Sequence, residues 1–348
     1  MNGNAVQGRV VVTGATGIVG WSIVNALHAE GHEVRAVARN VERTREVMPA
    51  GVDVVAGDLL DPYSLVGALA GCSTVFHAAG IPEQRLRDPG QFHQVNVQGT
   101  HTLVAAAMDE GVSAFVYTST IDVFAHHAGV RYNESMLETE PLPTAYERSK
   151  QLADYVVAEA VLRGLPARFI HPAAVFGPSP TRTPGLNDVI AKLAANRLAV
   201  LPPGGVPVVF APDVARGQIA AAGAPVGSRY ILCDRYLPFT ELAAAVQRVT
   251  GSRRPPQLSP RLARIASRLS EATSRVTGRP ALLPAGQLHF MTSHHIPDAG
   301  SATTELGWAP ISLEDAIAST IGQRSWLAGL GRPSVVVTNP NLHTGETP

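Results

Sequence analysis

Short runs of β-branched and aliphatic residues alternate with longer amphipathic stretches over the first 175 residues of this chain. Hydrophobic runs with strand character cover residues 10–13, 32–38, 52–56, 74–78, 114–119 and 167–170. Helical periodicity covers residues 18–30, 42–48, 64–69, 92–110 and 145–163. Strands that alternate with helices in this way pair in parallel through right-handed crossovers. The pattern therefore predicts an α/β fold with a doubly wound parallel sheet.

The pattern changes after residue 172, where proline and glycine become frequent at 172–185 and 202–212. A helix at 213–222 and a strand at 229–233 are expected to rejoin the sheet, and a further helix is expected at 240–250. We therefore predict three parts. They are a sheet domain (residues 9–175 plus about 205–235), a smaller C-terminal lobe (about 176–204 and 236–330) and a flexible tail (331–348).

Residues 260–277 combine a helical spacing of apolar residues with four arginines. The apolar positions are Leu262, Ile265, Leu269 and Val276. The favoured interpretation is a surface helix whose apolar stripe packs on the core. The alternative is a helix at a membrane surface or at a substrate entrance, because basic amphipathic helices also bind at such interfaces.

The composition narrows the class of protein. Hydrophobic residues make up 45% of the chain and charged residues 16%, which suits a sizeable core. The 28 basic and 28 acidic residues balance, so no nucleic-acid partner is expected. Cys72 and Cys233 offer no disulfide framework or CxxC pair, and the adjacent histidines 126–127 and 294–295 lack metal-ligand spacing. Without a signal-peptide pattern or a membrane-spanning apolar stretch, a cytoplasmic location is expected.

The first predicted strand–helix junction carries three glycines, in the sequence TGATGIVG at 13–20. Gly14 allows a sharp turn, Gly17 lets the backbone approach a pyrophosphate, and Gly20 lets the helix pack closely on the sheet. Free N–H groups at the helix start attract phosphate. The predicted binding residues are Gly14, Thr16, Gly17, Ile18 and Val19. We expect a Rossmann-type dinucleotide-binding domain with a substrate-binding lobe; the alternative is a tight turn without a ligand.

The end of the second predicted strand indicates which dinucleotide is bound. An acidic residue at this point marks NAD, but this chain has Arg39, followed by Arg43 and Arg45. A guanidinium suits a ribose 2′-phosphate, so NADP(H) is expected to be preferred, with NAD(H) as the alternative. Asp58, after the third strand, is a candidate partner for the adenine amino group, or it simply caps a turn.

A tyrosine and a lysine lie four residues apart at Tyr146 and Lys150, on one face of the predicted helix. A nearby ammonium lowers the pKa of a phenol, so Tyr146 is expected to act as a general acid or base. The preceding strand ends in hydroxyl groups at Ser119 and Thr120. Side chains alternate along a strand, so only one of these two can position a substrate carbonyl beside Tyr146. The sequence leaves that choice open.

Together these motifs resemble the extended short-chain dehydrogenases/reductases over about residues 9–323. The resemblance rests on TGxxGxxG at 13–20, Asp58-Leu59, HAAG at 77–80, NVxxT at 96–100, TST at 118–120 and Tyr146-xxx-Lys150. It implies that Tyr146 is the acid/base, that Lys150 holds the nicotinamide ribose, and that Thr120 is the catalytic hydroxyl. It further implies an active-site role for Asn96 and cofactor contacts from Leu59, Ala78, Ala79, Gly80, Pro172 and Val175.

Within that family the chain looks most like 3β-hydroxysteroid dehydrogenases and dihydroflavonol reductases, which act on ketones or secondary alcohols of bulky apolar molecules. Nucleotide-sugar epimerases and dehydratases are the rivals. Their typical asparagine and arginine are replaced here by Ala173-Ala174 and by an arginine-free segment at 204–210, which favours an apolar small-molecule substrate. A non-catalytic dinucleotide sensor is the alternative of another class. The resemblance also allows a homodimer.

Overall fold

The computed structural model describes residues 6–83, 86–125, 127, 129–181, 185–267, 291–292, 294 and 296–322. The predicted tail at 331–348 and the second half of the predicted basic helix lie outside the described residues.

A seven-stranded sheet in the order β10-β7-β5-β4-β1-β2-β3 forms the centre of the larger domain. Every neighbouring pair in it is parallel, which confirms the predicted doubly wound parallel sheet. The strands are β1 (Arg9–Thr13), β2 (Val34–Ala38), β3 (Asp53–Ala56), β4 (Cys72–His77), β5 (Ala114–Thr118), β7 (Ala167–Pro172) and β10 (Arg229–Leu232). Because all strands run the same way, their carboxyl ends meet along one edge, where the candidate residues lie.

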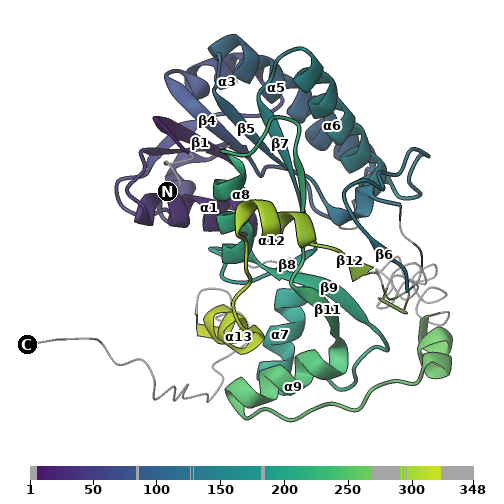
Figure 1. The fold of residues 1–348 in the computed structure, drawn as a ribbon. Helices are drawn as coiled ribbons and strands as arrows, with labels where there is room; N and C mark the ends of the chain where they lie inside the picture. Colours follow the sequence, from purple (N-terminus) through teal and green to yellow (C-terminus); the bar gives the residue numbers. More distant parts are fainter. Residues whose placement is uncertain are drawn as a thin grey trace, which may run out of the picture.

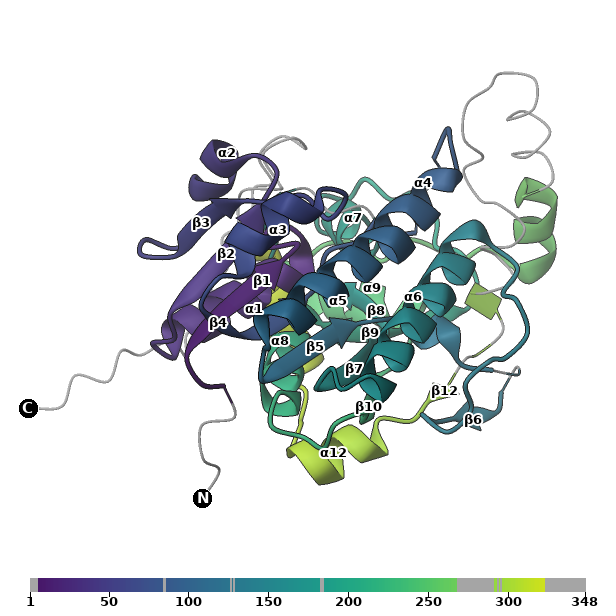
Figure 2. The ribbon, with the colours of Figure 1, turned by 90° about the horizontal axis from the view of Figure 1, so that it is seen from above.

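Helices cover both faces of this sheet (Figure 1). On one face are α3 (Pro62–Leu69), α5 (Gly99–Glu110) and α6 (Ala145–Leu162); on the other are α1 (Ile18–Ala29) and α8 (Ala211–Ala221). Side chains along β1 alternate between the two faces of the sheet, and both faces are apolar. Val11 belongs to the hydrophobic core under α3, α5 and α6. Its neighbours Val10 and Val12 belong to the core shared with α1 and α8. Figure 2 shows α5 and α6 side by side over the sheet.

Four shorter helices stand near the carboxyl ends of the strands. They are α2 (Val41–Arg45), α4 (Gly90–Phe92) with the π-helix His93–Gln98 that continues into α5, and the 3₁₀ helix Ile121–Val123 after β5. The sequence pattern predicts one helix over 92–110, whereas the structure has a π-helical segment at its start.

The second lobe has its own three-stranded sheet, in the order β11-β9-β8. Its elements are β8 (Ala174–Phe176), α7 (Leu186–Ala194), β9 (Gly205–Phe210), β11 (Arg235–Pro238), α9 (Phe239–Thr250) and α13 (Leu313–Gly322). The interval of about 205–235 that the sequence assigns to the sheet domain is therefore divided. β10 joins the large sheet and α8 covers one of its faces, while β9 pairs with β8 and β11.

The alternation of side chains along β9 explains this difference. Val208 and Phe210 are buried in the core of the second lobe. Val209, which points the opposite way, is buried in the core under the large sheet. Both faces of β9 are thus covered, so the strand lies between the two cores and belongs to the smaller sheet by its hydrogen bonds.

The remaining described elements link the two parts. A two-stranded sheet joins β6 (Arg131–Tyr132) to β12 (Ile296–Pro297), and α12 (Gly300–Leu306) follows. Helical residues 260–267 begin the predicted basic helix. There Leu262 and Ile265 are each 56% exposed, so the favoured prediction of an apolar stripe on the core is wrong for this part. Ala263 and Ser267 are the buried positions instead.

Candidate active site

The glycine turn after β1 has the shape that the sequence predicts. Gly14 has φ +69°, and a Cβ on it would lie 2.6 Å from the backbone nitrogen of Ala79, so only glycine fits. A Cβ on Gly20 would lie 2.2 Å from the Gly14 carbonyl oxygen. Helix α1 begins after Gly17, and no side chain caps its first turn. The helix start, with Thr16, is therefore open to a phosphate.

The first turn of α1 and the ends of the neighbouring strands meet at this point. Ile18 and Val19 open α1 and are partly exposed. The backbone nitrogens of Ala78 and Ala79, after β4, donate to the main-chain oxygen and the Oγ1 of Thr13 at 3.3 and 3.4 Å. Gly80 follows in an exposed position. The structure thus brings the predicted cofactor segments of β1 and β4 together.

The end of β2 presents a free cation. Arg39 is exposed, and among the described residues it has no hydrogen bond or ion pair. Arg45, which the sequence offers as a second cation, instead donates to the Val54 carbonyl oxygen at 3.3 Å. Asp58 accepts from the Leu60 nitrogen at 2.9 Å through one oxygen, as a turn-capping residue does. Arg43 is also exposed, so Arg39 at the strand end and Arg43 in α2 are the cations that this end offers to an anionic group.

The two hydroxyl groups after β5 have different partners. Ser119 Oγ donates to the buried carboxylate of Asp154 at 2.7 Å. Thr120 is hydrogen-bonded to the Tyr146 side chain, and its Oγ1 also donates to Asp122 Oδ2 at 2.8 Å. Of the two residues that the sequence leaves open, Thr120 is the one beside the tyrosine.

Tyr146 is the second residue of α6, whose start is set by a capping box between Thr144 and Glu147. The Phe92 ring packs edge-on against the Tyr146 ring, with 5.8 Å between the two ring centres. Burial raises the pKa of the Tyr146 hydroxyl, and Asp122 and Glu83 raise it further. The predicted lowering of this pKa by Lys150 is therefore wrong for the isolated chain, because burial and these carboxylates dominate. A raised pKa keeps Tyr146 protonated at neutral pH.

Lys150 is buried one helical turn further along α6. Its Nζ donates to the Thr118 carbonyl oxygen at 2.7 Å and lies 4.9 Å from the centre of the Tyr117 ring. Burial lowers the pKa of Lys150 to about 8, while Asp154 and Asp122 oppose this shift. The ammonium is thereby anchored to the end of β5, at the residue two positions before Thr120.

Asn96 lies in the π-helical segment, a type of helix that often marks functional sites. Its Nδ2 donates to Ser149 Oγ on α6 at 2.9 Å and to the Ile81 carbonyl oxygen at 3.2 Å. Its Oδ1 accepts from the Ile81 nitrogen at 2.7 Å. Asn96 thus ties the loop after β4 to the helix that carries Tyr146.

A buried chain of hydrogen bonds supports Asn96 from beneath. Thr100 Oγ1 donates to the Asn96 carbonyl oxygen at 2.6 Å, so it accepts from His77 Nε2 at 2.9 Å. His77 Nδ1 then accepts from Thr13 Oγ1 at 2.8 Å. Burial lowers the pKa of His77 to about 3, so the ring is neutral. This chain connects the glycine turn to the π-helix.

The remaining predicted residues lie around this centre. Pro172 ends β7 next to β5, and Val175 is partly buried on β8. Leu59 packs against Gly99, at the start of α5. Among the described residues no three His, Cys, Asp or Glu side chains cluster as a metal site would require. No helix in the described part is long and apolar enough to cross a membrane.

Three residues near the centre were not identified from the sequence. The buried Asp154 and His171 and the partly buried Arg229 form a polar group behind the end of β5. Asp154 follows Lys150 by one helical turn, a spacing that could have indicated it. No local pattern indicates Arg229, which comes from β10.

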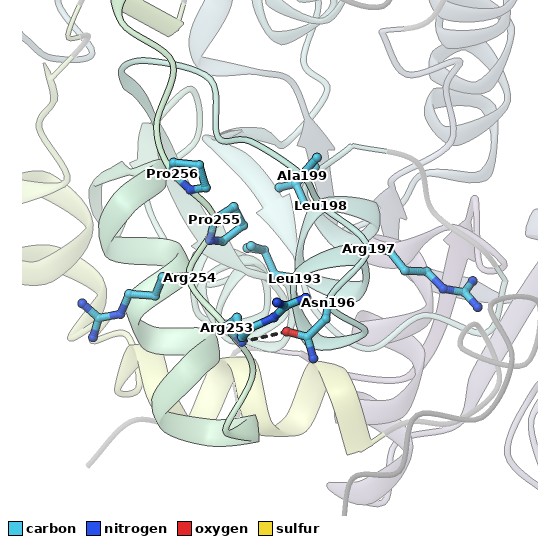
Figure 3. A pocket seen from close by; sticks show the side chains of 9 residues that line it. All are labelled: Leu193, Asn196, Arg197, Leu198, Ala199, Arg253, Arg254, Pro255 and Pro256. Atoms are coloured by element: carbon cyan, nitrogen blue, oxygen red, sulfur yellow. Dashed lines mark hydrogen bonds between the residues drawn. The ribbon is translucent and has the colours of Figure 1, made fainter.

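A pocket of about 390 Å³ lies in the second lobe, away from this centre (Figure 3). It is lined by residues after α7 and after α9, among them three arginines. Arg197 and Arg254 point away from each other, and Asn196 accepts from the Arg253 nitrogen at 2.7 Å. The arginines do not converge on one point, so the pocket does not form an anion site.

Comparisons with known proteins agree with this geometry. The NAD dependent epimerase/dehydratase family matches residues 10–232. The chain is 29% identical to sterol demethylase protein B of Methylococcus capsulatus over 89% of this chain and 96% of that protein. It is 32% identical to a 3-beta-hydroxysteroid dehydrogenase of Mycolicibacterium neoaurum over 49% of this chain and 48% of that protein. The crystal structure of gox2253 superposes with a TM-score of 0.78 at 28% identity, over 94% of this chain and 99% of that one.

Proposed function

This chain belongs to the NAD-dependent epimerase/dehydratase family, within the extended short-chain dehydrogenases/reductases, and we propose that it is a ketoreductase or secondary-alcohol dehydrogenase. It would transfer hydride reversibly between a nicotinamide cofactor and a bulky apolar substrate. The observation that carries this proposal is the convergence of Thr120, Tyr146 and Lys150 at the end of β5.

The residues of the site suit a reduction. Bound nicotinamide would supply the hydride to the carbonyl carbon. Tyr146, kept protonated by burial, would donate its proton to the carbonyl oxygen, so that an alcohol forms. Thr120 would hold that oxygen beside the phenol, and Lys150 would hold the nicotinamide ribose. In oxidation Tyr146 would take the proton back.

The residues also fit a dinucleotide. The uncapped start of α1 and the tight approach of Gly14 to Ala79 leave backbone N–H groups for the pyrophosphate. Arg39 is exposed and has no described partner, which supports a preference for NADP(H) through its 2′-phosphate. NAD(H) is the alternative.

An apolar substrate is favoured over a nucleotide sugar. The segment Gly205–Phe210 forms a fully buried strand without an arginine, so it offers no cation to a diphosphate. The named relatives include a sterol demethylase protein and a hydroxysteroid dehydrogenase, so one name refers to a sterol and the other to a steroid alcohol. We propose that this protein also acts on a sterol-sized or similarly apolar small molecule. We further propose that it does so in the cytoplasm and as a homodimer.

A panel of ketones and secondary alcohols tests the proposal. Turnover is followed by the absorbance of the reduced nicotinamide, with hydroxysteroids, flavonoid-like ketones and β-keto compounds beside nucleotide sugars. We expect net cofactor consumption with a member of the first group. Reaction of nucleotide sugars alone, without net consumption, would establish an epimerase or dehydratase instead. Cofactor binding without any turnover would favour a dinucleotide sensor.

A further inference from the structure

The residues that follow β5 are held from behind by two buried polar side chains. Ser119 Oγ donates to Asp154 Oδ2 at 2.7 Å. The carbonyl oxygen of Thr120 lies 3.2 Å from His171 Nδ1, which donates to it. Asp154 and His171 are 3% and 0% exposed, so water does not compete for these contacts. The backbone that carries the Thr120 hydroxyl is therefore positioned by groups on α6 and β7.

One guanidinium connects both of these side chains. Arg229 Nη1 donates to Asp154 Oδ1 at 2.5 Å and lies 3.3 Å from His171 Nε2. Burial lowers the pKa of His171 to about 4, so the ring is neutral and its Nε2 accepts this contact while Nδ1 carries the proton. The guanidinium carbon of Arg229 also lies over the Phe169 ring, 4.0 Å from the ring centre. Arg229 thus fixes both the carboxylate and the tautomer of the histidine.

Asp154 follows Lys150 by one turn of α6, so the two side chains lie on the same face of the helix and the carboxylate acts electrostatically on the ammonium. Burial disfavours the Lys150 ammonium, and Asp154 is the group that most strongly opposes this effect, followed by Asp122. The other titratable groups around Lys150 and Asp154 are His77, His171, Tyr117 and Tyr146. Burial keeps both histidines neutral and both phenols protonated. The acidic and basic side chains that remain in this region are Asp154, Asp122, Arg229 and Lys150 itself.

We propose that the Asp154–Arg229 pair is a positioning device for the reaction: Asp154, one helical turn from Lys150, provides the counter-charge to its ammonium, and Arg229, through His171, holds the backbone of Thr120. The inference rests on the proposed function, because it assigns Lys150 to the cofactor and Thr120 to the substrate oxygen. Neither Asp154 nor Arg229 touches the reacting atoms.

The first test measures cofactor binding against pH, by the fluorescence of the reduced nicotinamide, in the wild type and in Asp154→Asn. Affinity needs the Lys150 ammonium and is lost as the pH rises through the pKa of Lys150, about 8 in the folded chain. Without the Asp154 charge this pKa falls further. The midpoint of affinity loss should therefore move to lower pH, by about one unit, which is tenfold in the ionisation constant. An unchanged midpoint would overturn the proposal.

Two further variants distinguish the proposed effect on Lys150 from a general loss of folding. Asp154→Asn leaves Arg229 buried without its counter-charge, so the double variant Asp154→Asn/Arg229→Gln removes both charges together. It should show the same shift of the midpoint. The matched control is Asp53→Asn, because Asp53 pairs with Arg35 at 2.8 Å at the other edge of the sheet. The control should keep the wild-type midpoint, and an equal shift in it would contradict a specific role for Asp154.

A second variant isolates the link to Thr120. Arg229→Lys keeps a positive charge near Asp154 but cannot contact both Asp154 and His171. We expect an unchanged pH midpoint with kcat about tenfold lower, since misplacing a positioned group slows the chemical step. A wild-type kcat in Arg229→Lys would show that Arg229 does not position Thr120 through His171. If no ketone is turned over at all, the proposed function fails, while the binding midpoint still decides the role of Asp154.

Discussion

The two sides of the large sheet present different chemistry at their carboxyl ends. On the β1–β2 side the available groups are main-chain N–H groups at the start of α1 and the exposed Arg39. On the β5–β7 side they are the buried side chains of Lys150, Asp154 and His171, each of which is hydrogen-bonded to a residue at the end of β5 or just after it. A phosphate can be bound by backbone shape alone, whereas an acid must be held rigidly at a reacting atom.

On the β5–β7 side, removing the Tyr146 hydroxyl should have the largest effect on kcat. Tyr146→Phe retains the ring that packs on Phe92 but has no proton to transfer. We expect kcat to fall by about 10²–10⁴-fold, the usual contribution of general acid–base catalysis. Cofactor affinity, measured by fluorescence titration, should stay nearly unchanged. A variant with near wild-type turnover would show that another group donates the proton.

Removing the Thr120 hydroxyl, which lies beside that phenol, should have the second-largest effect on kcat. Thr120→Val preserves the shape of the side chain but removes the group that is hydrogen-bonded to Tyr146. If Thr120 holds the substrate oxygen, kcat should fall by about 10²-fold, as for the loss of one oxyanion donor. Steady-state kinetics with the substrate from the panel measure this. A change confined to KM would assign Thr120 to substrate binding alone.

On the β1–β2 side we expect a smaller effect that concerns the choice of cofactor. Arg39→Asp replaces the free cation with a carboxylate that repels a 2′-phosphate. One lost charge-assisted hydrogen bond corresponds to about ten- to a hundredfold in NADP(H) affinity, so preference should shift towards NAD(H).

The ratio of kcat/KM for the two cofactors measures this shift. Arg163→Asp makes the same change of charge at the exposed far end of α6, and this control should keep the wild-type ratio. A wild-type preference for NADH would contradict the role given to Arg39.

The same comparison shows what could be predicted from the sequence. The turn at Gly14 and the Tyr146–Lys150 pair are local, because each depends on residues within one turn or one helix. Arg229 reaches Asp154 across 75 residues of chain, and no local periodicity encodes such a contact. The pKa of Tyr146 was predicted in the wrong direction for the same reason. Its burial and its neighbour Asp122 arise only when α6 packs beside the end of β5.

The choice between Ser119 and Thr120 also depended on tertiary structure. Strand alternation showed that the two hydroxyls diverge, but not which one faces α6 at Tyr146. The position of Asp154 explains the difference, because this carboxylate, eight residues after Tyr146 on α6, accepts the hydrogen bond of the Ser119 hydroxyl.

The smallest effect is therefore expected for Ser119→Ala. The variant removes the hydrogen bond to Asp154, which keeps its contact with Arg229 and hence its charge beside Lys150. Hydrogen bonds to charged groups contribute about 1.5–3 kcal/mol, so the free energy of unfolding should fall by about this amount in urea denaturation. The kcat should change by less than about tenfold, a barrier change below about 1.4 kcal/mol. If kcat instead falls as far as in Thr120→Val, the catalytic hydroxyl would not belong to Thr120 alone.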